Sequence, residues 1–330
     1  MHKTILIYGE NWQGSLPQLL YADLTGRGIN TKIFDYTDIM PGIKNRNFID
    51  KVRRRLFYSR YVKRINKQFL KKINSAKPDV VIIAKGLHIS LKTLKIIRGT
   101  NTQLINWNPD DFFNMKNSNG VLIESLKFYD LIVSSRRHLF DKYYSYGAKD
   151  LLFVDWYYVP SLHFSQDLEK TIDYSFVGSW SKYREEFITQ IERPFVIRGA
   201  GWEKSSTSFK KYNDVDSKIL TQLQMRRLFN ITKVNLNILT PENEDISNLR
   251  FFEVPASGGL LLTERNSHST LYLDDKIDCL MYSSVDEIKD IMDKNLFPSK
   301  IAISGTKKIM ESEHSFSHRV DKLIRYISYE

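Results

Sequence analysis

Short apolar runs alternate with amphipathic stretches of helical period along the chain. Residues 3–9 (KTILIYG), 77–86 (KPDVVIIAKG) and 102–111 (TQLINWNPDD) are such runs, and stretches with helical spacing separate them. Strands that are buried on both faces of a parallel sheet read as nearly continuous apolar runs. The alternation therefore predicts an α/β fold built from doubly wound parallel sheets.

The alternation stops and restarts near the middle of the chain. Pro160 and neighbouring polar residues interrupt it, after which the strand and helix patterns return. A chain of 330 residues suits two domains better than one core. We predict two Rossmann-like domains facing a central cleft, an N-terminal one over residues 1–160 and a C-terminal one over residues 161–312. Residues 313–330 are predicted as a closing helix that packs across the domains.

Composition narrows the class of protein. No run reaches the roughly 18 consecutive apolar residues of a membrane-spanning helix. The N-terminal apolar stretch is short and ends at Gly9, so it reads as a first strand and not as a signal peptide. The one cysteine, Cys279, has no partner for an internal disulfide and no metal-ligand spacing around it. A cytoplasmic enzyme or binding protein fits these features best.

Positive charge is concentrated in one segment. The chain has 49 Lys and Arg against 38 Asp and Glu, and residues 44–72 hold twelve of the basic residues with one acid, Asp50. Apolar residues recur there at nearly helical spacing, which predicts one or two basic amphipathic helices. Three uses stay open: a solvated outer helix, a dock on an anionic membrane surface near a lipid-linked acceptor, and nucleic-acid binding, which is the least favoured.

Residues 244–264 (EDISNLRFFEVPASGGLLLTE) crowd polar and charged residues into a short stretch before an apolar run. A short helix is predicted to begin at Ser247 or Asn248, where free N–H groups and the positive end of the helix dipole form an anion site. Glu253 lies further along this helix and can reach ligand hydroxyls. An ordinary helix–strand crossover with a solvated acidic face is the equally weighted alternative on these residues alone.

Candidate acceptor-side residues lie in the first half. Asp110 and Asp111 end a predicted strand at the carboxyl edge, where α/β proteins bind ligands. One of them acts as a general base or positions an acceptor hydroxyl, or else both cap the following turn. Lys85 ends the preceding strand. Gly14, in the first strand-to-helix turn, lets the backbone approach a phosphate or an acceptor.

The motif at residues 248–265 (NLRFFEVPASGGLLLTER) resembles R-x-F-E-x-x-A-x-G-x-x-x-L-T, a signature of glycosyltransferases related to the spore-maturation protein CgeB. These resemble the wider GT-B, family-4-like group (glycosyl transferases group 1), which uses sugar nucleotides. Residues 77–97, 129–154 and 174–188 are similar to further units of the same family. The similarity spans nearly the whole chain in order and implies the GT-B fold.

The resemblance also implies roles for individual residues. Asp245 and Glu253 occupy two acidic positions eight residues apart, with Asp245 facing the donor sugar and Glu253 binding the ribose hydroxyls. Backbone groups of Asn248 and Leu249 receive the diphosphate in this scheme. The remaining donor-binding residues are the cations Arg184, Lys182 and Arg250, with Gly199 and Gly201 in a loop near the nucleotide base.

Two neighbouring features are interpreted structurally. Trp202 follows the glycine loop and either stacks on the base or packs in the core, with packing favoured. Asp214 and Asp216 match the Asp-x-Asp of metal-dependent transferases but are interpreted as a helix cap. No metal site and no cofactor are predicted.

The function implied is transfer of a sugar from a nucleotide-diphosphate sugar, with a UDP-sugar as first choice, to a hydroxyl of a glycan, lipid-linked or protein acceptor. Retention and metal independence are expected, in the synthesis of a bacterial surface polysaccharide or related glycan. If the reaction inverts, Asp110 or Asp111 is the expected base. A non-catalytic sugar-nucleotide-binding module and a nucleic-acid-directed protein are the alternatives. The expected location is cytoplasmic, with a peripheral position on the inner face of the membrane left open.

Overall fold

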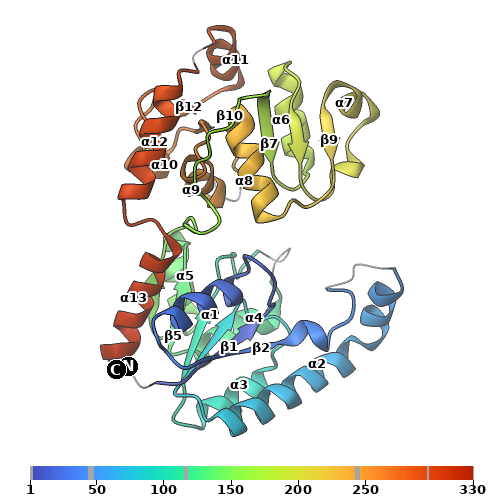
Figure 1. Cartoon of the computed structure of the whole chain (residues 1–330). Helices are drawn as coiled ribbons and strands as arrows, with labels where there is room; N and C mark the ends of the chain where they lie inside the picture. The colour runs from blue at the N-terminus through green and yellow to red at the C-terminus, as the bar shows by residue number, and fades with distance from the viewer. Residues whose placement is uncertain (1–2, 44–47, 115–117, 242–245, 296, 330) are drawn as a thin grey trace. The chain divides into compact units, whose positions relative to one another are not determined.

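The computed structural model describes residues 3–43, 48–114, 118–241, 246–295 and 297–329, and it divides the chain into two compact units. The first unit comprises Met1–Asp155 with Arg319–Glu330, and the second comprises Trp156–His318. Each unit contains one parallel six-stranded sheet with helices against it (Figure 1). The predicted α/β class with two doubly wound sheets is therefore confirmed.

The sheet of the first unit has the strand order β2-β1-β3-β4-β5-β6. The order reverses between β1 and β3, so the carboxyl ends of these two strands form the switch point at which such sheets bind ligands. All residues of β1 and β3 are buried, as their continuous apolar runs predict. The elements are β1 Ile5–Gly9, α1 Leu16–Gly26, β2 Thr31–Asp35, η1 Tyr36–Asp38, α2 Phe48–Ala76, β3 Val80–Ala84, α3 Leu91–Arg98, β4 Gln103–Trp107, α4 Gly120–Ser125, η2 Leu126–Phe128, β5 Leu131–Ser134, η3 Arg137–Leu139, α5 Phe140–Ser145 and β6 Leu151–Phe153.

The sheet of the second unit has the order β12-β11-β10-β7-β8-β9, and its switch point lies between β7 and β10. Its helices cover a core that includes Phe176, Trp202 and Leu262. The elements of this unit are β7 Ile172–Val177, α6 Lys182–Ile191, β8 Val196–Arg198, η4 Trp202–Lys204, α7 Thr207–Tyr212, β9 Asp214–Asp216, α8 Gln222–Ile231, β10 Thr232–Asn237, α9 Leu249–Ala256, β11 Leu261–Glu264, α10 Ser267–Tyr272, β12 Leu280–Tyr282, α11 Val285–Asp293 and α12 Ser299–Glu311, and the last helix, α13 Phe316–Tyr329, begins here and continues into the first unit.

The interpretation of Asp214 and Asp216 as a helix cap is wrong. They form the edge strand β9, which pairs in parallel with β8. Asp214 lies beside Arg198 of β8, with Oδ2 2.7 Å from the guanidinium Nη2. This cross-strand ion pair favours the extended conformation. Because Val215 is the one apolar residue of this strand, its sequence lacks the apolar run that marks the buried strands.

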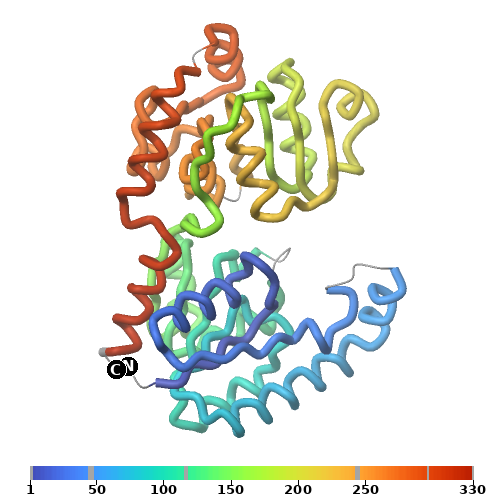
Figure 2. The backbone as a smooth tube through the Cα atoms, in the orientation of Figure 1, coloured from blue at the N-terminus to red at the C-terminus, as the bar shows by residue number. Residues whose placement is uncertain are grey.

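The basic segment forms α2, in which two helical stretches meet at a kink at Phe57, where the backbone leaves helical geometry (Figure 2). Its buried residues all lie after that break, at Ile65, Asn66, Phe69 and Ile73. Residues 44–47 of the predicted segment lie outside the described residues. None of the helices in the described ranges has the length and apolar content of a membrane-spanning segment.

The chain passes from the first unit to the second at Asp155–Trp156, close to the boundary predicted at residue 160. The last helix, α13, returns to the first unit from Arg319 onward. Arg319 donates from Nε to the carbonyl of Asp155 at 3.0 Å, and Lys3 donates to the carbonyl of Ile327 at 2.6 Å. These two contacts join α13 to the start of the first unit at Lys3 and to the end of its first segment at Asp155.

His88 makes the first unit sensitive to acid. Its Nδ1 lies 3.0 Å from the hydroxyl of Tyr58, and burial lowers its pKa from the ordinary 6.5 to about 4. The unfolded chain therefore binds a proton between these values that the folded unit does not, so stability falls as the pH drops below about 6.5. We expect a loss of about 2 kcal/mol at about pH 5 from this group.

His88→Asn tests this expectation, because Asn tolerates the positive φ of 64° at this position. Chemical unfolding at neutral and acidic pH should show a smaller acid-induced loss in the variant than in the wild type. An equal loss in both proteins would show that another group controls the acid response.

Candidate donor-binding site

The start of α9 and the end of β10 are fixed to each other by a chain of amide hydrogen bonds. Asn248 is the N-cap of α9, and its side-chain oxygen accepts from the backbone N–H of Phe251 at 3.2 Å. Its Nδ2 donates to Oδ1 of Asn237 at 2.8 Å, and Asn237 donates in turn to Thr263 Oγ1 at 3.1 Å. The predicted helix start at Asn248 is confirmed, and the positive end of α9 lies at the carboxyl end of β10.

Arg184 is held in a fixed orientation across the switch point. It lies in the first turn of α6, which Ser181 caps by accepting from the N–H of Arg184 at 3.2 Å. Its guanidinium donates to the carbonyl of Ser179 at 2.9 Å and to that of Ile238 at 3.2 Å. The same group lies over the ring of Phe176, 5.5 Å from its centroid. These contacts join the ends of β7 and β10 through one cation.

A cavity of about 220 Å³ opens at this switch point. Four of the predicted donor-binding residues line it, namely Arg184, Asn248, Leu249 and Arg250. Its other lining residues are Trp156, Phe176, Val177, Gly178, Asn237 and Ile238. Two guanidinium groups and a helix N-terminus thus share one small cavity, an arrangement suited to an anionic ligand.

Lys182 lies elsewhere. Its side chain is 83% exposed, and its ammonium is 3.6 Å from Glu186 on the outer face of α6. The structure therefore brings Arg184 into the cavity and leaves Lys182 in solvent. Asp245, the predicted donor-sugar acid, lies outside the described residues.

Glu253 is buried behind the cavity and does not line it. It is 3% exposed, and its carboxylate pairs with the guanidinium of Arg250. Arg250 also donates from Nε to the carbonyl of Val177 at 3.3 Å. Glu253 therefore neutralises and holds a cation that faces the cavity, while contact of Glu253 itself with a ribose stays a prediction.

His163 completes this buried cluster and is a residue that sequence reasoning missed. Its Nε2 lies 3.6 Å from Oε1 of Glu253, and its Nδ1 accepts from the N–H of Val159 at 3.0 Å. Because Nδ1 accepts, a neutral ring carries its proton on Nε2, toward Glu253. Burial lowers the pKa of His163 despite the nearby carboxylate. A single histidine in a linker carries no spacing signal by which it could have been found.

Gly199 and Gly201 shape the loop after β8 and lie outside the cavity lining. Gly199 has a φ of +144°, and a Cβ there would lie 2.2 Å from the carbonyl oxygen of Gly178. Trp202 is fully buried, stacks on Phe209 with ring centroids 5.5 Å apart, and donates to the carbonyl of Gly178 at 2.8 Å. The prediction that Trp202 packs in the core is confirmed, and the glycines allow the β8 loop to approach Gly178.

Gly199→Ala is expected to disturb this loop strongly. The backbone conformation alone costs an alanine about 1–3 kcal/mol, and the clash with the carbonyl of Gly178 adds to it. Since Gly178 lines the cavity, ligand affinity should fall together with the melting temperature. Gly26→Ala is the control, because a Cβ at Gly26 meets nothing within 4 Å. A Gly199→Ala protein that melts like the Gly26→Ala protein would refute the close approach of this loop to Gly178.

The acceptor-side candidates gather at the carboxyl edge of the first unit's sheet. Lys85 Nζ lies 2.7 Å from Oδ2 of Asp110. Asp111 accepts from the N–H of Phe113 at 2.7 Å, so it caps the following turn, which was one of its two predicted roles. Gly14 has a φ of +85° in the loop after β1 and donates to Gln18 at 3.2 Å. Lys85 and Gly14 thus follow β3 and β1, the strands on either side of the switch point.

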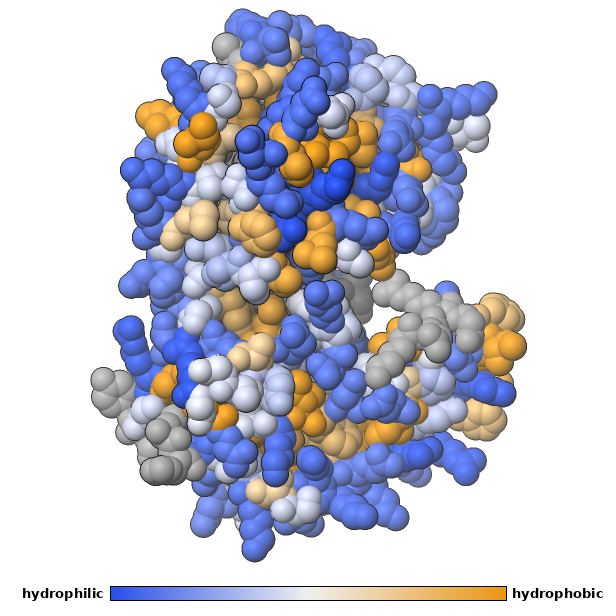
Figure 3. Space-filling model, viewed as in Figure 1, coloured by the Kyte–Doolittle hydropathy of each residue, from blue (hydrophilic) through white to orange (hydrophobic). Residues whose placement is uncertain are grey.

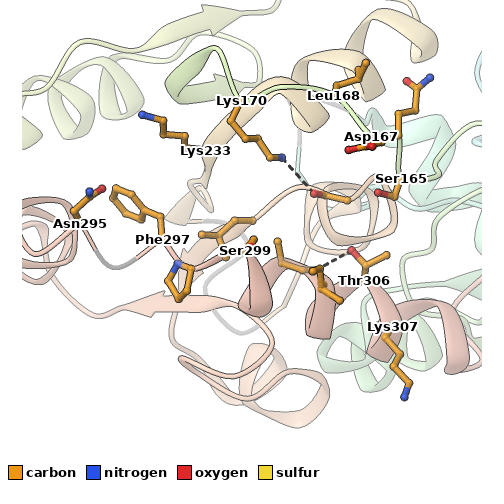
Figure 4. Close-up of a pocket in the computed structure, with 16 residues that line it drawn as sticks. Ser165, Asp167, Leu168, Lys170, Lys233, Asn295, Phe297, Ser299, Thr306 and Lys307 are labelled. Atoms are coloured by element: carbon orange, nitrogen blue, oxygen red, sulfur yellow. Dashed lines mark hydrogen bonds between the residues drawn. The ribbon is translucent and has the colours of Figure 1, made fainter.

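A larger cavity, about 700 Å³, lies at the opposite, amino edge of the second unit's sheet (Figure 4). Lys170, Lys233, Phe297 and Thr306 are among its lining residues. Lys170 donates to the carbonyl of Asn230 at 2.5 Å, and Lys233 lies 2.7 Å from Asp173, so both ammonium groups already have protein partners. Parallel sheets bind ligands at their carboxyl edge, which favours the smaller cavity as the functional one.

Within the described ranges, no group of three or more His, Cys, Asp or Glu side chains is arranged to hold a metal ion. No curated protein matches the sequence significantly.

Solved structures with the same fold are numerous and distant in sequence. Sucrose-phosphate synthase from Thermosynechococcus elongatus superposes with a TM-score of 0.72 at 8% identity, covering 99% of this chain and 100% of that one. Anabaena HepE, solved with UDP and glucose, gives a TM-score of 0.65 at 8% identity and covers 100% of both chains. A trehalose-6-phosphate synthase, studied for glycosyl transfer with retention, gives 0.65 at 12% identity over 99% of both chains.

These likenesses confirm the GT-B fold, in which each unit is one Rossmann-like half. Residues 183–325 match a protein-family model described as glycosyl transferase-like. The match covers α6, α9 and the cavity residues from Arg184 to Arg250. The family match and the fold both agree with the predicted class of enzyme, a glycosyltransferase. Residues 183–325 are therefore similar to a glycosyl transferase-like family model, in a chain with the GT-B fold.

Proposed function

We propose that the protein transfers a sugar from a nucleotide-diphosphate sugar to a hydroxyl acceptor, with a UDP-sugar as the first donor to test. The observation that carries this proposal is the cavity at the β7/β10 switch point, where Arg184, Arg250 and the N-terminus of α9 converge. The HepE structures with UDP and with UDP-glucose support the choice of nucleotide, because they share this fold.

The chemistry requires positive charge where the glycosidic bond breaks. As the bond between the sugar and the diphosphate opens, the departing diphosphate gains negative charge. Arg184 and Arg250 donate planar, charge-assisted hydrogen bonds, and the free N–H groups of α9 add a dipole of the same sign. Because these groups supply the positive charge that a metal ion would otherwise provide, we propose that the reaction needs no metal.

Retention of the anomeric configuration is part of the proposal because the resemblance is to retaining enzymes. Trehalose-6-phosphate synthase, which shares the fold, supports it. In a retaining reaction the donor phosphate deprotonates the acceptor hydroxyl, and no protein nucleophile is needed. The inverting alternative uses Asp110 or Asp111 as the base, and Lys85 Nζ lies 2.7 Å from Oδ2 of Asp110 at that edge.

The acceptor is proposed to be a glycan, a lipid-linked saccharide or a protein, in the synthesis of a bacterial surface polysaccharide or related glycan. The finer assignment to CgeB-like enzymes rests on the motif at residues 248–265. A cytoplasmic location, with a peripheral position on the inner face of the membrane as an open alternative, belongs to the same proposal.

The experiment is release of nucleoside diphosphate from a panel of nucleotide sugars, measured with and without EDTA. Turnover of one UDP-sugar, unchanged by the chelator, is the expected result. Turnover that EDTA abolishes would refute metal independence. Saturable UDP binding without hydrolysis or transfer to any acceptor would favour the alternative of a non-catalytic sugar-nucleotide-binding module.

A further inference from the structure

The first turns of α2 expose a row of large apolar side chains. Phe48, Ile49 and Leu56 are 78%, 63% and 70% exposed, and Val52 is 38% exposed. Ile49, Val52 and Leu56 follow one another at intervals of three and four residues, so they share one face of the helix. Figure 3 shows hydrophobic residues gathered at this end of α2, at the right-hand edge of the view.

This face points away from the body of the first unit. Arg54 is half-buried, with Nη1 3.5 Å from the carbonyl of Gly42, and Tyr58 contacts His88, so these two residues mark the inner side of the helix. Leu56 is two residues from Arg54, which places it roughly 200° around the helix axis. The exposed row is therefore not an extension of the core-facing row at Ile65, Phe69 and Ile73.

Positive charge borders the exposed row. Arg53 lies three residues before Leu56 and so borders the row on the same face, and Arg60 follows just after the break at Phe57; both arginines are exposed. Asp50 is the one acid in the helix, 3.9 Å from Arg53. A helix with apolar and aromatic residues on one face and arginines at its borders matches the pattern of segments that lie in the interface of an anionic bilayer.

We propose that the N-terminal turns of α2, residues 48–60, insert their apolar face into the surface of an anionic phospholipid membrane. The second part of the helix, in which Ile65, Phe69 and Ile73 are buried, anchors this face to the unit. Nucleic acid fits the row less well, because it would leave Ile49 and Leu56 in water. The inference deepens the membrane partner of the proposed function and does not depend on the donor cavity.

Vesicle flotation of the full chain tests the proposal, with phosphatidylcholine vesicles that contain or lack phosphatidylglycerol. The wild type should float with the anionic vesicles and less so at high salt. Ile49→Gln/Leu56→Gln and Arg53→Gln/Arg60→Gln should each weaken binding about tenfold or more. Lys67→Gln/Lys71→Gln is the control, because it removes the same charge from exposed positions of the second part of α2.

Three results would overturn the proposal. The wild type fails to bind anionic vesicles, or the Lys67/Lys71 control weakens binding as much as the Arg53/Arg60 variant does, or the apolar variant binds like the wild type. Light scattering on the same samples tests whether a second copy of the chain covers the apolar face instead of a membrane. A dimeric wild type with a monomeric Ile49→Gln/Leu56→Gln variant would show this and overturn the proposal. UDP titration of each variant measures nucleotide binding by the second unit. Loss of vesicle binding with normal UDP binding would therefore concern only the membrane proposal, and loss of UDP binding would concern only the donor site.

Discussion

Arg184→Gln is expected to lower kcat/KM for the nucleotide sugar about 100-fold or more, the effect of removing one preorganised charged donor from a transition state. Arg184 lines the cavity, and three contacts fix it: two backbone carbonyls and the face of Phe176. Its charge is therefore in place before the diphosphate departs. Because the leaving group gains charge in the transition state, kcat should fall along with the affinity for UDP.

Lys182→Gln is the matched control for this prediction. It removes one positive charge from the same turn of α6, but its ammonium is in solvent beside Glu186. Its kcat/KM should stay within about threefold of the wild type, the range of a screened surface charge. If Lys182→Gln were as damaging as Arg184→Gln, the cavity would not be the place where the diphosphate binds.

Glu253→Gln is expected to destabilise the second unit by about 3 kcal/mol and to weaken nucleotide binding in the same protein. Removing one partner of a buried ion pair leaves the other charge uncompensated, at a cost of about 3–5 kcal/mol, and the partial exposure of Arg250 reduces it. Without the carboxylate, Arg250 loses the group that fixes it beside the cavity. Chemical unfolding and UDP calorimetry measure the two effects.

The double variant Arg250→Met/Glu253→Met separates stability from binding. Replacing both members of a buried ion pair by apolar residues is often neutral for stability. We therefore expect the double variant to unfold near the wild-type denaturant concentration while its UDP affinity stays low. Recovery of both properties would show that Arg250 has no part in binding the nucleotide.

The α/β fold could be predicted from the sequence because inner strands such as β1 and β3 are buried on both faces. β1 and β3 are continuous apolar runs, and such short runs between amphipathic stretches are typical of the inner strands of parallel sheets. The start of α9 was predictable for a similar reason, since the Asn248 cap is a local interaction between residues three apart.

The details of the site depend on contacts that no local pattern contains. Arg184 and Lys182 are two residues apart on one helix, and the family resemblance implied the same role for both. Two such positions are roughly 200° apart around the axis, so only one of them faces the cavity. The burial of Glu253 behind Arg250, with His163 beside it, depends on a linker ninety residues upstream. Long-range packing of this kind leaves no periodic signal.

The different burial of the two parts of α2 also could not be predicted from the sequence. The apolar spacing predicted amphipathic helices, but it could not show that Ile65 and Phe69 are buried while Ile49 and Leu56 are exposed. Both sets are large apolar residues at helical spacing. Their different burial comes from which part of the helix meets the rest of the first unit.

Calorimetric titration of UDP into the wild type and Arg184→Gln, with GDP, ADP and CMP as competitors, tests the central claim most directly. The account predicts saturable binding of one nucleoside diphosphate to the wild type and the loss of that binding in the variant, which still unfolds in a cooperative thermal transition. Absence of nucleotide binding even at millimolar concentration, or equal binding by both proteins, would contradict a donor site at the β7/β10 switch point.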